Sequence, residues 1–234
     1  MDLKNKVFIL TGAVRIGVDV GKGLLSKGAK LTVTYFNNKP DLGPDVLYIQ
    51  ADLSLEEHVK KVVAETKKHF GQLDGLIHMA ATYQKTTWQE LNLEVFQNSL
   101  NPILRSAFLL SKAVGDELQR SVTGGKIILF SDWSVLNQPY KDYLAYNVAK
   151  SAVVGLMKSL AKELAPKVSV NAIAPGPILK PADLSDADNA EVLKNTPLEK
   201  WGGEHEITKA VLYLLDADFV TGQVLFVDGG RSIA

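Results

Sequence analysis

Short apolar runs alternate along the chain with longer stretches in which apolar residues recur at the spacing of one helix face. The short runs predict strands, because a strand buried on both faces is apolar throughout, and the longer stretches predict amphipathic helices. The predicted strands cover Val7–Leu10, Lys30–Tyr35, Val46–Ala51, Leu73–Met79, Lys126–Phe130, Lys167–Ala172 and Gly222–Asp228. The predicted helices run to Lys27 and to Phe70, over Leu93–Arg120, to Leu164 and over Glu204–Leu215.

The alternation of strands and helices continues over the whole chain, without an internal repeat or a linker. It predicts an α/β fold with a doubly wound parallel sheet, helices on both faces, and one domain over residues 1–234. In such sheets ligands bind at the carboxyl ends of the strands, near the point where the strand order reverses. The residues predicted at those ends are Gly12, Asp52, Ala80, Asp132 and Pro175.

Two local patterns add detail to this outline. Ser54 followed by Glu57 matches a capping box, which predicts the start of the helix that runs to Phe70. The polar segment 178–200, which contains Pro181 and Pro197, precedes the last predicted helix. Long polar segments at ligand sites often supply a mobile lid, and we expect one here.

Tyr146 and Lys150 are four residues apart on a predicted helix, so their side chains lie on one face, one turn apart. A cationic Lys beside a phenol favours the phenolate and is expected to lower the pKa of Tyr146, which permits proton exchange near neutral pH. The spacing alone is common in a chain of this length. Its meaning depends on whether a nucleotide site faces it, and Asp132 is predicted at the same sheet edge.

The segment Thr11–Gly17 connects the first predicted strand to a helix. In that position Gly12 and Gly17 let the backbone approach a pyrophosphate, while the helix N-terminus offers free N–H groups and a positive dipole end. The pattern favours a phosphate-binding turn. A tight strand-to-helix turn without a ligand is the alternative.

The end of the second predicted strand distinguishes the two nicotinamide dinucleotides. NAD sites usually place an acid there to accept a hydrogen bond from the ribose 2′-hydroxyl, and this chain has no acid before Asp41. A 2′-phosphate would instead be bound by polar or basic side chains, which favours NADP(H) over NAD(H); the candidates are Arg15, Asn37, Asn38 and Lys39. For Lys39, a place in a solvated loop is the alternative.

Composition argues against several other functions. Lys and Arg together number 26, as do Asp and Glu, so the zero formal charge gives no support to a nucleic-acid partner. The absence of cysteine excludes disulfides, thiolate catalysis and Cys-ligated metals. His58, His69 and His205 lack metal-ligand spacing, and His78 is expected to be a satisfied interior residue. No apolar run approaches the roughly 18 residues of a membrane span, and the chain enters its first strand without a signal segment, so we expect a cytoplasmic protein.

Several motifs, in order and over the whole chain, resemble those of the short-chain dehydrogenase/reductase family. They are Thr11-Gly12…Gly17, Asp52-Leu53-Ser54, Tyr146-x-x-x-Lys150, Asn171-Ala172-Ile173-Ala174-Pro175-Gly176 and Gly222-Gln223…Val227-Asp228-Gly229-Gly230. The resemblance implies a Rossmann-fold, NAD(P)-dependent oxidoreductase of a small molecule, assembled as a homotetramer or dimer through its two long helices. It implies that Tyr146 donates a proton to the substrate, while Lys150 lowers the pKa of Tyr146 and holds the nicotinamide ribose.

The same resemblance implies where the cofactor lies. Asp52 is expected near the adenine and Pro175-Gly176 near the nicotinamide. The full set of expected cofactor-binding residues is Gly12, Arg15, Ile16, Gly17, Asn37, Asp52, Leu53, Ala80, Lys150, Pro175 and Gly176.

Within the family, the chain resembles the pteridine reductases, which reduce C=N bonds of pterins with NADPH. Most members have Ser at the position of Asp132, whereas Asp there with an Arg in the glycine-containing turn, here Arg15, is similar to this subgroup. Tyr83 aligns with the aromatic residue that stacks on the pterin, and the segments Asn137-Gln138-Pro139 and Gly229-Gly230-Arg231-Ser232-Ile233 also agree. A carboxylate accepts hydrogen bonds from ring nitrogens and exocyclic amines better than a hydroxyl does.

Two aromatic residues have open roles at this stage. Tyr83 is expected either to form a substrate platform or to pack in its loop. Trp133 is expected either to shape the pocket or to pack against a neighbouring subunit. The predicted substrate-binding residues are Tyr83, Asp132 and Trp133.

The chain also departs from the family pattern. The glycine-containing turn is one residue shorter, one extra residue separates Asp132 from Tyr146, and His78-Met79-Ala80-Ala81 stands where the family has Asn-Asn-Ala-Gly. Ile103 occupies the place of a catalytic Asn, and Asn101, two positions away on a predicted helix, is expected to point elsewhere. These departures argue against a proton relay through the long helix, but hydride transfer requires only the cofactor, Tyr146 and Lys150.

The sequence therefore predicts an NADPH-dependent reductase of a C=O or C=N bond, pterin-like by preference, with Asp132, Tyr146 and Lys150 as catalytic residues. The enzymatic alternative is a 3-oxoacyl reductase or a sugar or alcohol dehydrogenase. An aromatic pocket at Tyr83 would favour a pterin-like substrate, and an elongated acyl channel would favour the enzymatic alternative. A nucleotide-binding sensor without turnover is the alternative from another class, motivated by the short turn, Met79 and Ile103.

Overall fold

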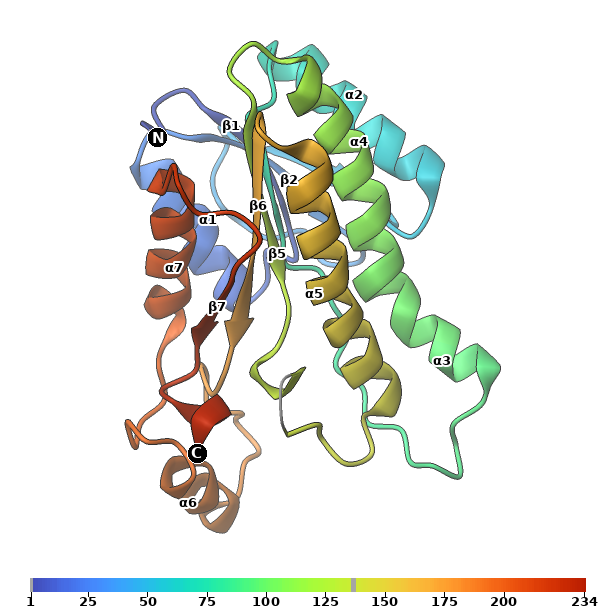
Figure 1. Cartoon of the computed structure of the whole chain (residues 1–234), viewed down its shortest axis with the longest axis vertical. Helices are drawn as coiled ribbons and strands as arrows, with labels where there is room; N and C mark the ends of the chain where they lie inside the picture. The colour runs from blue at the N-terminus through green and yellow to red at the C-terminus, as the bar shows by residue number, and fades with distance from the viewer. Residues whose placement is uncertain (1, 136–137) are drawn as a thin grey trace.

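The strands form a single parallel sheet. The computed structural model describes residues 2–135 and 138–234, and in these residues seven strands pair in the order β3-β2-β1-β4-β5-β6-β7 (Figure 1). Every neighbouring pair is parallel, and the order reverses between β1 and β4. The strands are β1 (Val7–Thr11), β2 (Lys30–Tyr35), β3 (Leu47–Gln50), β4 (Gly75–His78), β5 (Gly125–Phe130), β6 (Val168–Pro175) and β7 (Val224–Val227).

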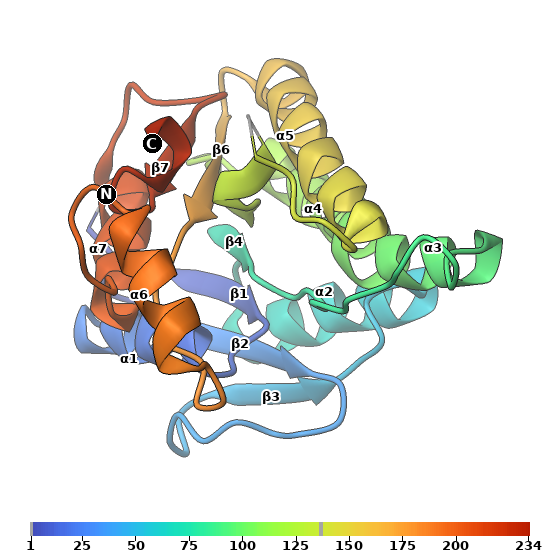
Figure 2. The same cartoon turned by 90° about the horizontal axis from the view of Figure 1, so that it is seen from below.

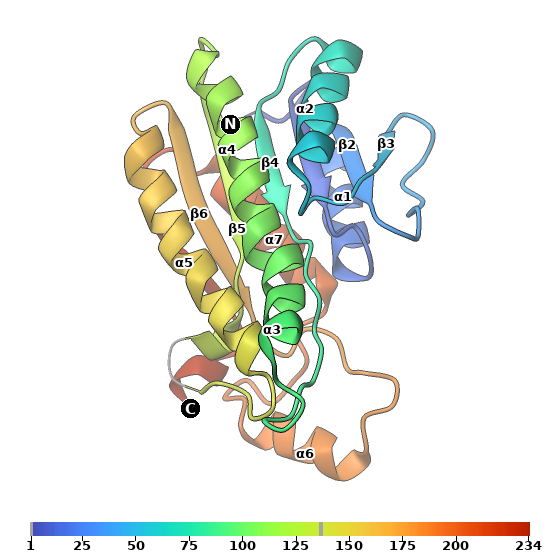
Figure 3. The ribbon, with the colours of Figure 1, turned by 90° about the vertical axis from the view of Figure 1, so that its right-hand side faces the viewer.

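Helices cover both faces of the sheet, which confirms the predicted doubly wound α/β fold. Helices α1 and α7 pack on one face, and α2, α4 and α5 pack on the other (Figures 1 and 3). The α-helices are α1 (Ile16–Ser26), α2 (Glu56–Phe70), α3 (Leu93–Leu100), α4 (Ser106–Arg120), α5 (Leu144–Leu164), α6 (Asp186–Lys194) and α7 (Glu204–Asp216).

The central strands are apolar throughout because each face of the sheet carries its own core. In β1, Phe8 and Leu10 belong to the core under α1 and α7, whereas Val7 and Ile9 belong to the core under α2, α4 and α5. Successive side chains of a strand point to opposite faces, so all four are buried. Burying one such side chain stabilises the fold by about 1.5–3 kcal/mol, which explains why short apolar runs marked the strands so clearly.

The predicted helix over Leu93–Arg120 contains a π-helical turn at Asn101–Arg105, between α3 and α4. Pro102 lacks an N–H group and cannot donate to a regular helical ladder, and the N–H of Ser106 bonds to the carbonyl of Asn101, five residues back. A π-turn adds one residue to a helix and rotates the residues before it relative to those after it. The predicted helix over Leu93–Arg120 is confirmed, with one π-helical turn inside it.

The predicted capping box at Ser54 does not form. Helix α2 begins at Glu56, its N-cap is Leu55, and no side chain caps it. The hydroxyl of Ser54 donates instead to Asp52 Oδ1 at 2.7 Å, and the N–H of Ser54 bonds to the same oxygen at 2.9 Å. Ser54 is therefore part of the turn after β3 and does not cap α2, because the carboxylate of Asp52, two residues before it, binds its side chain.

The segment 178–200 contains helix α6, which the sequence pattern did not indicate. Ser185 is its N-cap, and the Ser185 hydroxyl accepts from the N–H of Asp188 at 3.1 Å. Figure 1 shows α6 and the C-terminus at the end of the molecule where the strands finish, and Figure 2, seen from that end, shows α6 on the side of α1 and α7. None of the helices in residues 2–135 and 138–234 is long and apolar enough to cross a membrane.

His78 links the sheet to α4 from the end of β4. Its Nδ1 lies 3.0 Å from Thr11 Oγ1, and its Nε2 lies 3.1 Å from Ser106 Oγ. Thr11 Oγ1 also accepts from the N–H groups of Met79 and Ala80, at 3.1 and 3.0 Å. Burial, with a smaller effect of the Lys150 charge, lowers the pKa of His78 from 6.5 to about 3. As expected, His78 is a buried, neutral and hydrogen-bonded residue.

We expect this buried imidazole to make the fold sensitive to acid. Between pH 6.5 and about 3 the unfolded chain binds a proton at His78 and the folded chain does not. The free energy of unfolding should therefore fall as the pH falls, by up to about 1.4 kcal/mol per pH unit from this residue. The check is urea denaturation of the wild type and of His78→Asn, which keeps a polar side chain that does not titrate. Equal pH slopes for the two proteins would contradict the account.

Candidate active site

Asp132 and Tyr146 are in direct contact at the carboxyl end of β5. The phenolic O–H of Tyr146, in the first turn of α5, donates to Asp132 Oδ2 at 2.7 Å. The other carboxylate oxygen, Oδ1, accepts from the N–H of Ser134 at 2.9 Å. The carboxylate thus has a fixed position, and it orients the phenol.

Lys150 lies one helical turn beyond Tyr146 and is only 4% exposed. Its Nζ donates to the carbonyl of Phe130 at 2.9 Å and lies 5.8 Å from the centre of the Tyr146 ring. Burial lowers the pKa of Lys150 to about 8, and the charge of Asp132 opposes this effect. An ammonium group has three N–H donors, so this one can bind further acceptors in the cavity that it lines.

The pKa of Tyr146 shifts in the direction opposite to the sequence-based expectation. Burial, followed by the charge of Asp132 and the hydrogen bond to it, raises the pKa of Tyr146 above its ordinary value. The expected lowering by Lys150 was wrong because it left out the burial of the phenol and its contact with a carboxylate. At neutral pH Tyr146 is therefore a protonated phenol, which is the form that donates a proton.

Aromatic side chains form one wall beside this pair. Tyr83 stacks on Tyr143 with ring centroids 4.4 Å apart, and its ring meets that of Tyr146 edge-on at 4.9 Å. Trp133 is 6% exposed and donates its indole N–H to the hydroxyl of Tyr140. Tyr83 thus packs in its loop and, being 58% exposed, also lines the cavity, while Trp133 forms part of the pocket wall.

The catalytic candidates face a cavity that continues into a second one. The first, of about 530 Å³, is lined by Asp132, Tyr146 and Lys150. The second, of about 540 Å³, is lined by residues that follow β2 and β3. Both are within the size range of ligand sites, and both open at the reversal of strand order between β1 and β4. The residues that line both cavities are Gly12, Val14, Met79 and Ala81.

The short turn after β1 is tightly packed and strained. A Cβ atom at Gly12 would lie 2.6 Å from the backbone carbon of Met79, and one at Gly17 would lie 2.3 Å from the carbonyl oxygen of Gly12. Arg15 has φ 49° and ψ −110° and sits inside a turn closed by the N–H of Gly17 and the carbonyl of Val14 at 2.9 Å. Glycine is the residue that favours this conformation. The turn is one residue short, and Arg15 adopts the strained backbone that closes it.

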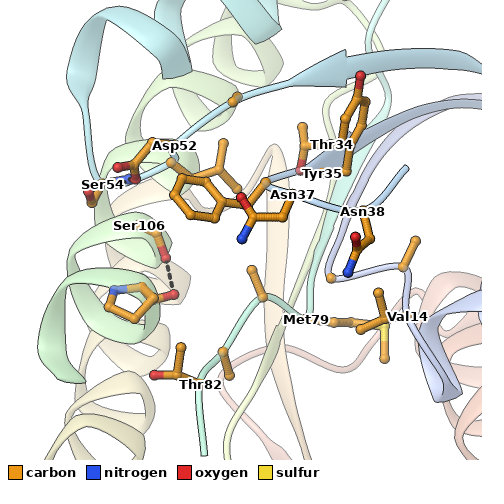
Figure 4. Close-up of a pocket in the computed structure, with 18 of the residues that line it drawn as sticks. Val14, Thr34, Tyr35, Asn37, Asn38, Asp52, Ser54, Met79, Thr82 and Ser106 are labelled. Atoms are coloured by element: carbon orange, nitrogen blue, oxygen red, sulfur yellow. Dashed lines mark hydrogen bonds between the residues drawn. The ribbon is translucent and has the colours of Figure 1, made fainter. Parts of the chain in front are cut away.

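The second cavity contains the polar residues that follow β2. Figure 4 shows the amides of Asn37 and Asn38 in this pocket, between Asp52 and Val14. Lys39 does not line either cavity, because its ammonium lies over the ring of Tyr48, 4.4 Å from the centroid. The prediction that Lys39 could contact a cofactor phosphate is therefore not supported, and its solvated-loop alternative fits better.

These features fit a dinucleotide. Helix α1 begins at the glycine turn without a side-chain cap, and the positive end of its dipole lies at the cavity, while the N–H groups of Gly17 and Val18 bond to the carbonyls of Val14 and Arg15. One cavity offers amides beside Asp52, and the other offers the ammonium of Lys150. Apart from Lys39, the residues predicted to bind cofactor or substrate line at least one of the two cavities: Gly12, Arg15, Ile16, Gly17, Asn37, Asn38, Asp52, Leu53, Ala80, Tyr83, Asp132, Trp133, Tyr146, Lys150, Pro175 and Gly176.

Sequence reasoning missed other residues in the cavity walls. Asn101, in the π-helical turn, lines the second cavity and, as expected, does not line the first one with the catalytic candidates. Pro102 is the signal in the sequence that could have indicated this turn. Ile103, in contrast, is buried in the core at 1% exposure. Arg231 and Trp201, distant in sequence, line the first cavity. Asn137, part of one predicted motif, lies outside the described residues.

Comparison with known proteins gives consistent matches over the whole chain. A family model described as Enoyl-(Acyl carrier protein) reductase matches residues 12–232. The 3-oxoacyl-[acyl-carrier-protein] reductase of Synechocystis is 30% identical, with 97% of each chain covered.

Solved structures agree with these sequence matches. A variant of a Serratia marcescens short-chain dehydrogenase/reductase has a TM-score of 0.89 at 29% identity and covers 99% of this chain and 100% of its own. The ligand-free aldohexose dehydrogenase of Thermoplasma acidophilum has a TM-score of 0.92 at 26% identity and covers 100% and 96%.

We expect the strain at Arg15 to be measurable as stability. Arg15→Gly relieves the unfavourable backbone conformation, whereas Arg15→Ala removes the same guanidinium and keeps the Cβ atom. Arg15→Gly should have a larger free energy of unfolding than Arg15→Ala, by about 1 kcal/mol, after the greater chain entropy of glycine is included. Urea denaturation of the two variants is the check. If Arg15→Ala is equally or more stable, the turn is not strained.

Proposed function

Because the chain belongs to the short-chain dehydrogenase/reductase family of oxidoreductases, we propose that it uses NADP(H) to reduce a C=O or C=N bond of a small, flat substrate. A pterin-like ring is the favoured substrate class. The observation that carries the proposal is the contact of Tyr146 with Asp132, beside buried Lys150, in an aromatic-walled cavity.

In this proposal Tyr146 is the proton donor. The nicotinamide, when bound, supplies a hydride to the unsaturated carbon of the substrate. Tyr146 turns its O–H from Asp132 to the substrate oxygen or nitrogen and gives up the proton, which completes the reduction. The resulting phenolate lies near the ammonium of Lys150, whose positive charge stabilises it below a pH of about 8. The raised pKa of Tyr146 keeps the proton on the phenol until the substrate oxygen or nitrogen accepts it.

Asp132 supports the choice of a substrate with N–H groups. A carboxylate only accepts hydrogen bonds, so it binds ring N–H groups or amines and repels electron-rich oxygens. The neighbouring rings of Tyr83, Tyr140 and Trp133 suit a flat ring, because aromatic groups prefer stacked or edge-to-face contacts. An alkyl chain would not use the carboxylate. These contacts are what favours a pterin-like ring.

The preference for NADP(H) rests on the residues after β2. Asn37 and Asn38 supply amide donors in the second cavity, and Arg15 lines the adjoining one. A 2′-phosphate would meet hydrogen-bond donors there, and the first acid after the strand is Asp41. NADP(H) is therefore the proposed cofactor.

A second candidate function comes from the relatives. One is a 3-oxoacyl-[acyl-carrier-protein] reductase and one an aldohexose dehydrogenase, so reduction of a 3-oxoacyl group or oxidation of a sugar is the alternative reaction. At about 30% identity these names do not fix the substrate, and Asp132 is the residue that argues for another one.

The proposed assembly is a homotetramer or dimer paired through the long helices. Apolar side chains are exposed on these helices, among them Phe108 on α4 and Leu144 and Val148 on α5. Such side chains are typical of the centre of a subunit interface. The cytoplasmic location expected from the sequence stays a prediction.

The direct test is NADPH oxidation with a panel of dihydropterins, a 3-oxoacyl thioester and cyclic ketones. We expect the wild type to turn over the pterin-like compounds fastest, and faster with NADPH than with NADH. Tyr146→Phe removes only the donated proton, so it should lower kcat by about 10²–10⁴-fold. NADPH binding, followed by cofactor fluorescence, should stay unchanged in this variant.

Two results would count against the proposal. Binding of NADPH without turnover of any compound, unchanged by Tyr146→Phe, would favour a nucleotide-binding sensor. Fastest turnover of the 3-oxoacyl thioester would favour the second candidate and leave the family assignment intact.

A further inference from the structure

Arg231 reaches the first cavity from the C-terminal 3-10 helix Arg231–Ile233. The turn before it is held by Asp228, which is 8% exposed and accepts from the N–H of Gly230 at 3.0 Å and from the N–H of Ser232 at 2.8 Å. Gly229 and Gly230 have φ of 64° and 87°, a conformation that glycine adopts without strain. The backbone that carries Arg231 is therefore held in place before any ligand binds.

The guanidinium of Arg231 keeps hydrogen-bonding capacity in the cavity. Its Nη1 donates to the carbonyl of Val192 in α6 at 2.7 Å, and its Cζ lies 5.1 Å from the centre of the Trp133 ring. A guanidinium has five N–H donors, and this is the one hydrogen bond that it makes with the described residues. Arg231 is partly buried, and no carboxylate within the described ranges lies within 4.0 Å of it.

The same cavity therefore contains two opposite charges that do not pair with each other. Asp132 is bound by Tyr146 and Ser134, whereas Arg231 lies over Trp133. A partly desolvated cation without an anion is unfavourable, and such groups are typical of binding sites. The cation–π contact with the indole face of Trp133 offsets part of this cost. It leaves the N–H groups at the edge of the Arg231 guanidinium available for another acceptor.

We propose that Arg231 is a substrate-recognition residue that binds an anionic oxygen, in the first place a carboxylate, on the part of the substrate remote from the bond that is reduced. Asp132 and Tyr146 bind the reacting end, and Arg231 binds the other end across the aromatic wall. The preferred substrates are then flat rings that carry an N–H or a carbonyl at one end and a carboxylate at the other. This inference rests on the proposed function for the reacting end only.

A purely structural role for Arg231 makes a different prediction. If its bond to Val192 only holds α6 in place, its loss affects all substrates alike, because α6 borders the cavity for each of them. If Arg231 binds the substrate, the loss is confined to substrates with the anionic group. A matched pair of probes separates these roles.

The experiment compares 4-acetylbenzoate with its methyl ester, which have the same ring and the same reducible ketone and differ in the remote carboxylate. NADPH oxidation is measured with the full-length wild type, Arg231→Gln, Arg231→Lys and the control Arg120→Gln, which removes an exposed cation from α4. Arg231→Gln should lower kcat/KM for the acid about tenfold, as for loss of a charged hydrogen bond, and leave the ester unchanged. Arg231→Lys should recover part of the loss, and Arg120→Gln should match the wild type.

Binding of each probe is also followed by tryptophan fluorescence, which does not depend on turnover. The inference is overturned if Arg231→Gln lowers kcat/KM and affinity equally for the acid and the ester. It is also overturned if the wild type binds the acid no more tightly than the ester. If the wild type binds the acid more tightly through Arg231 but oxidises no NADPH, the anion site stands and the proposed reductase function fails. If the wild type reduces both probes, and Arg231→Gln leaves the ratio of kcat/KM for the acid to kcat/KM for the ester unchanged, the reductase function stands and the anion site fails.

Discussion

The hydrogen bond between Tyr146 and Asp132 is the contact on which the site depends. It places a carboxylate at 2.7 Å from the phenol, and together with burial it keeps the phenol protonated. The Nζ atom of Lys150 lies 5.8 Å from the centre of the Tyr146 ring, and its pKa of about 8 keeps it charged at neutral pH, as the proposed stabilisation of a Tyr146 phenolate requires. At neutral pH the site therefore holds a protonated phenol at Tyr146 beside the ammonium of Lys150.

The fold brings these groups together because parallel strands end at one edge. Asp132 follows β5, the glycine turn follows β1, and Pro175 ends β6, so distant segments share one crevice. The buried bridge of Thr11, His78 and Ser106 joins β1, β4 and α4 just behind that crevice. A polar network fully paired inside the core fixes the relative positions of the elements that carry the site.

Much of this arrangement could be predicted from the sequence, because strand runs such as Val7–Leu10 and spacing such as that of Tyr146 and Lys150 depend on local periodicity. What could not be predicted depends on contacts between distant residues. The pKa of Tyr146 depends on a carboxylate fourteen residues away, and the ammonium of Lys39 lies over the ring of Tyr48. Ser54 is a local exception, because the acceptor that competes with the predicted cap, Asp52, lies only two residues before it.

The central claim is that burial and Asp132 raise the pKa of Tyr146 by more than the charge of Lys150 lowers it. Titration of the tyrosines tests this claim most directly. In a protein labelled with ¹³C at the tyrosine ring, the Tyr146 resonance is assigned by its loss in Tyr146→Phe and followed against pH by NMR. The account predicts that Tyr146 stays a phenol beyond the ordinary tyrosine pKa of 10.0, and that Asp132→Asn lowers its pKa. Titration of Tyr146 well below that value in the wild type, unaffected by Asp132→Asn, would contradict it.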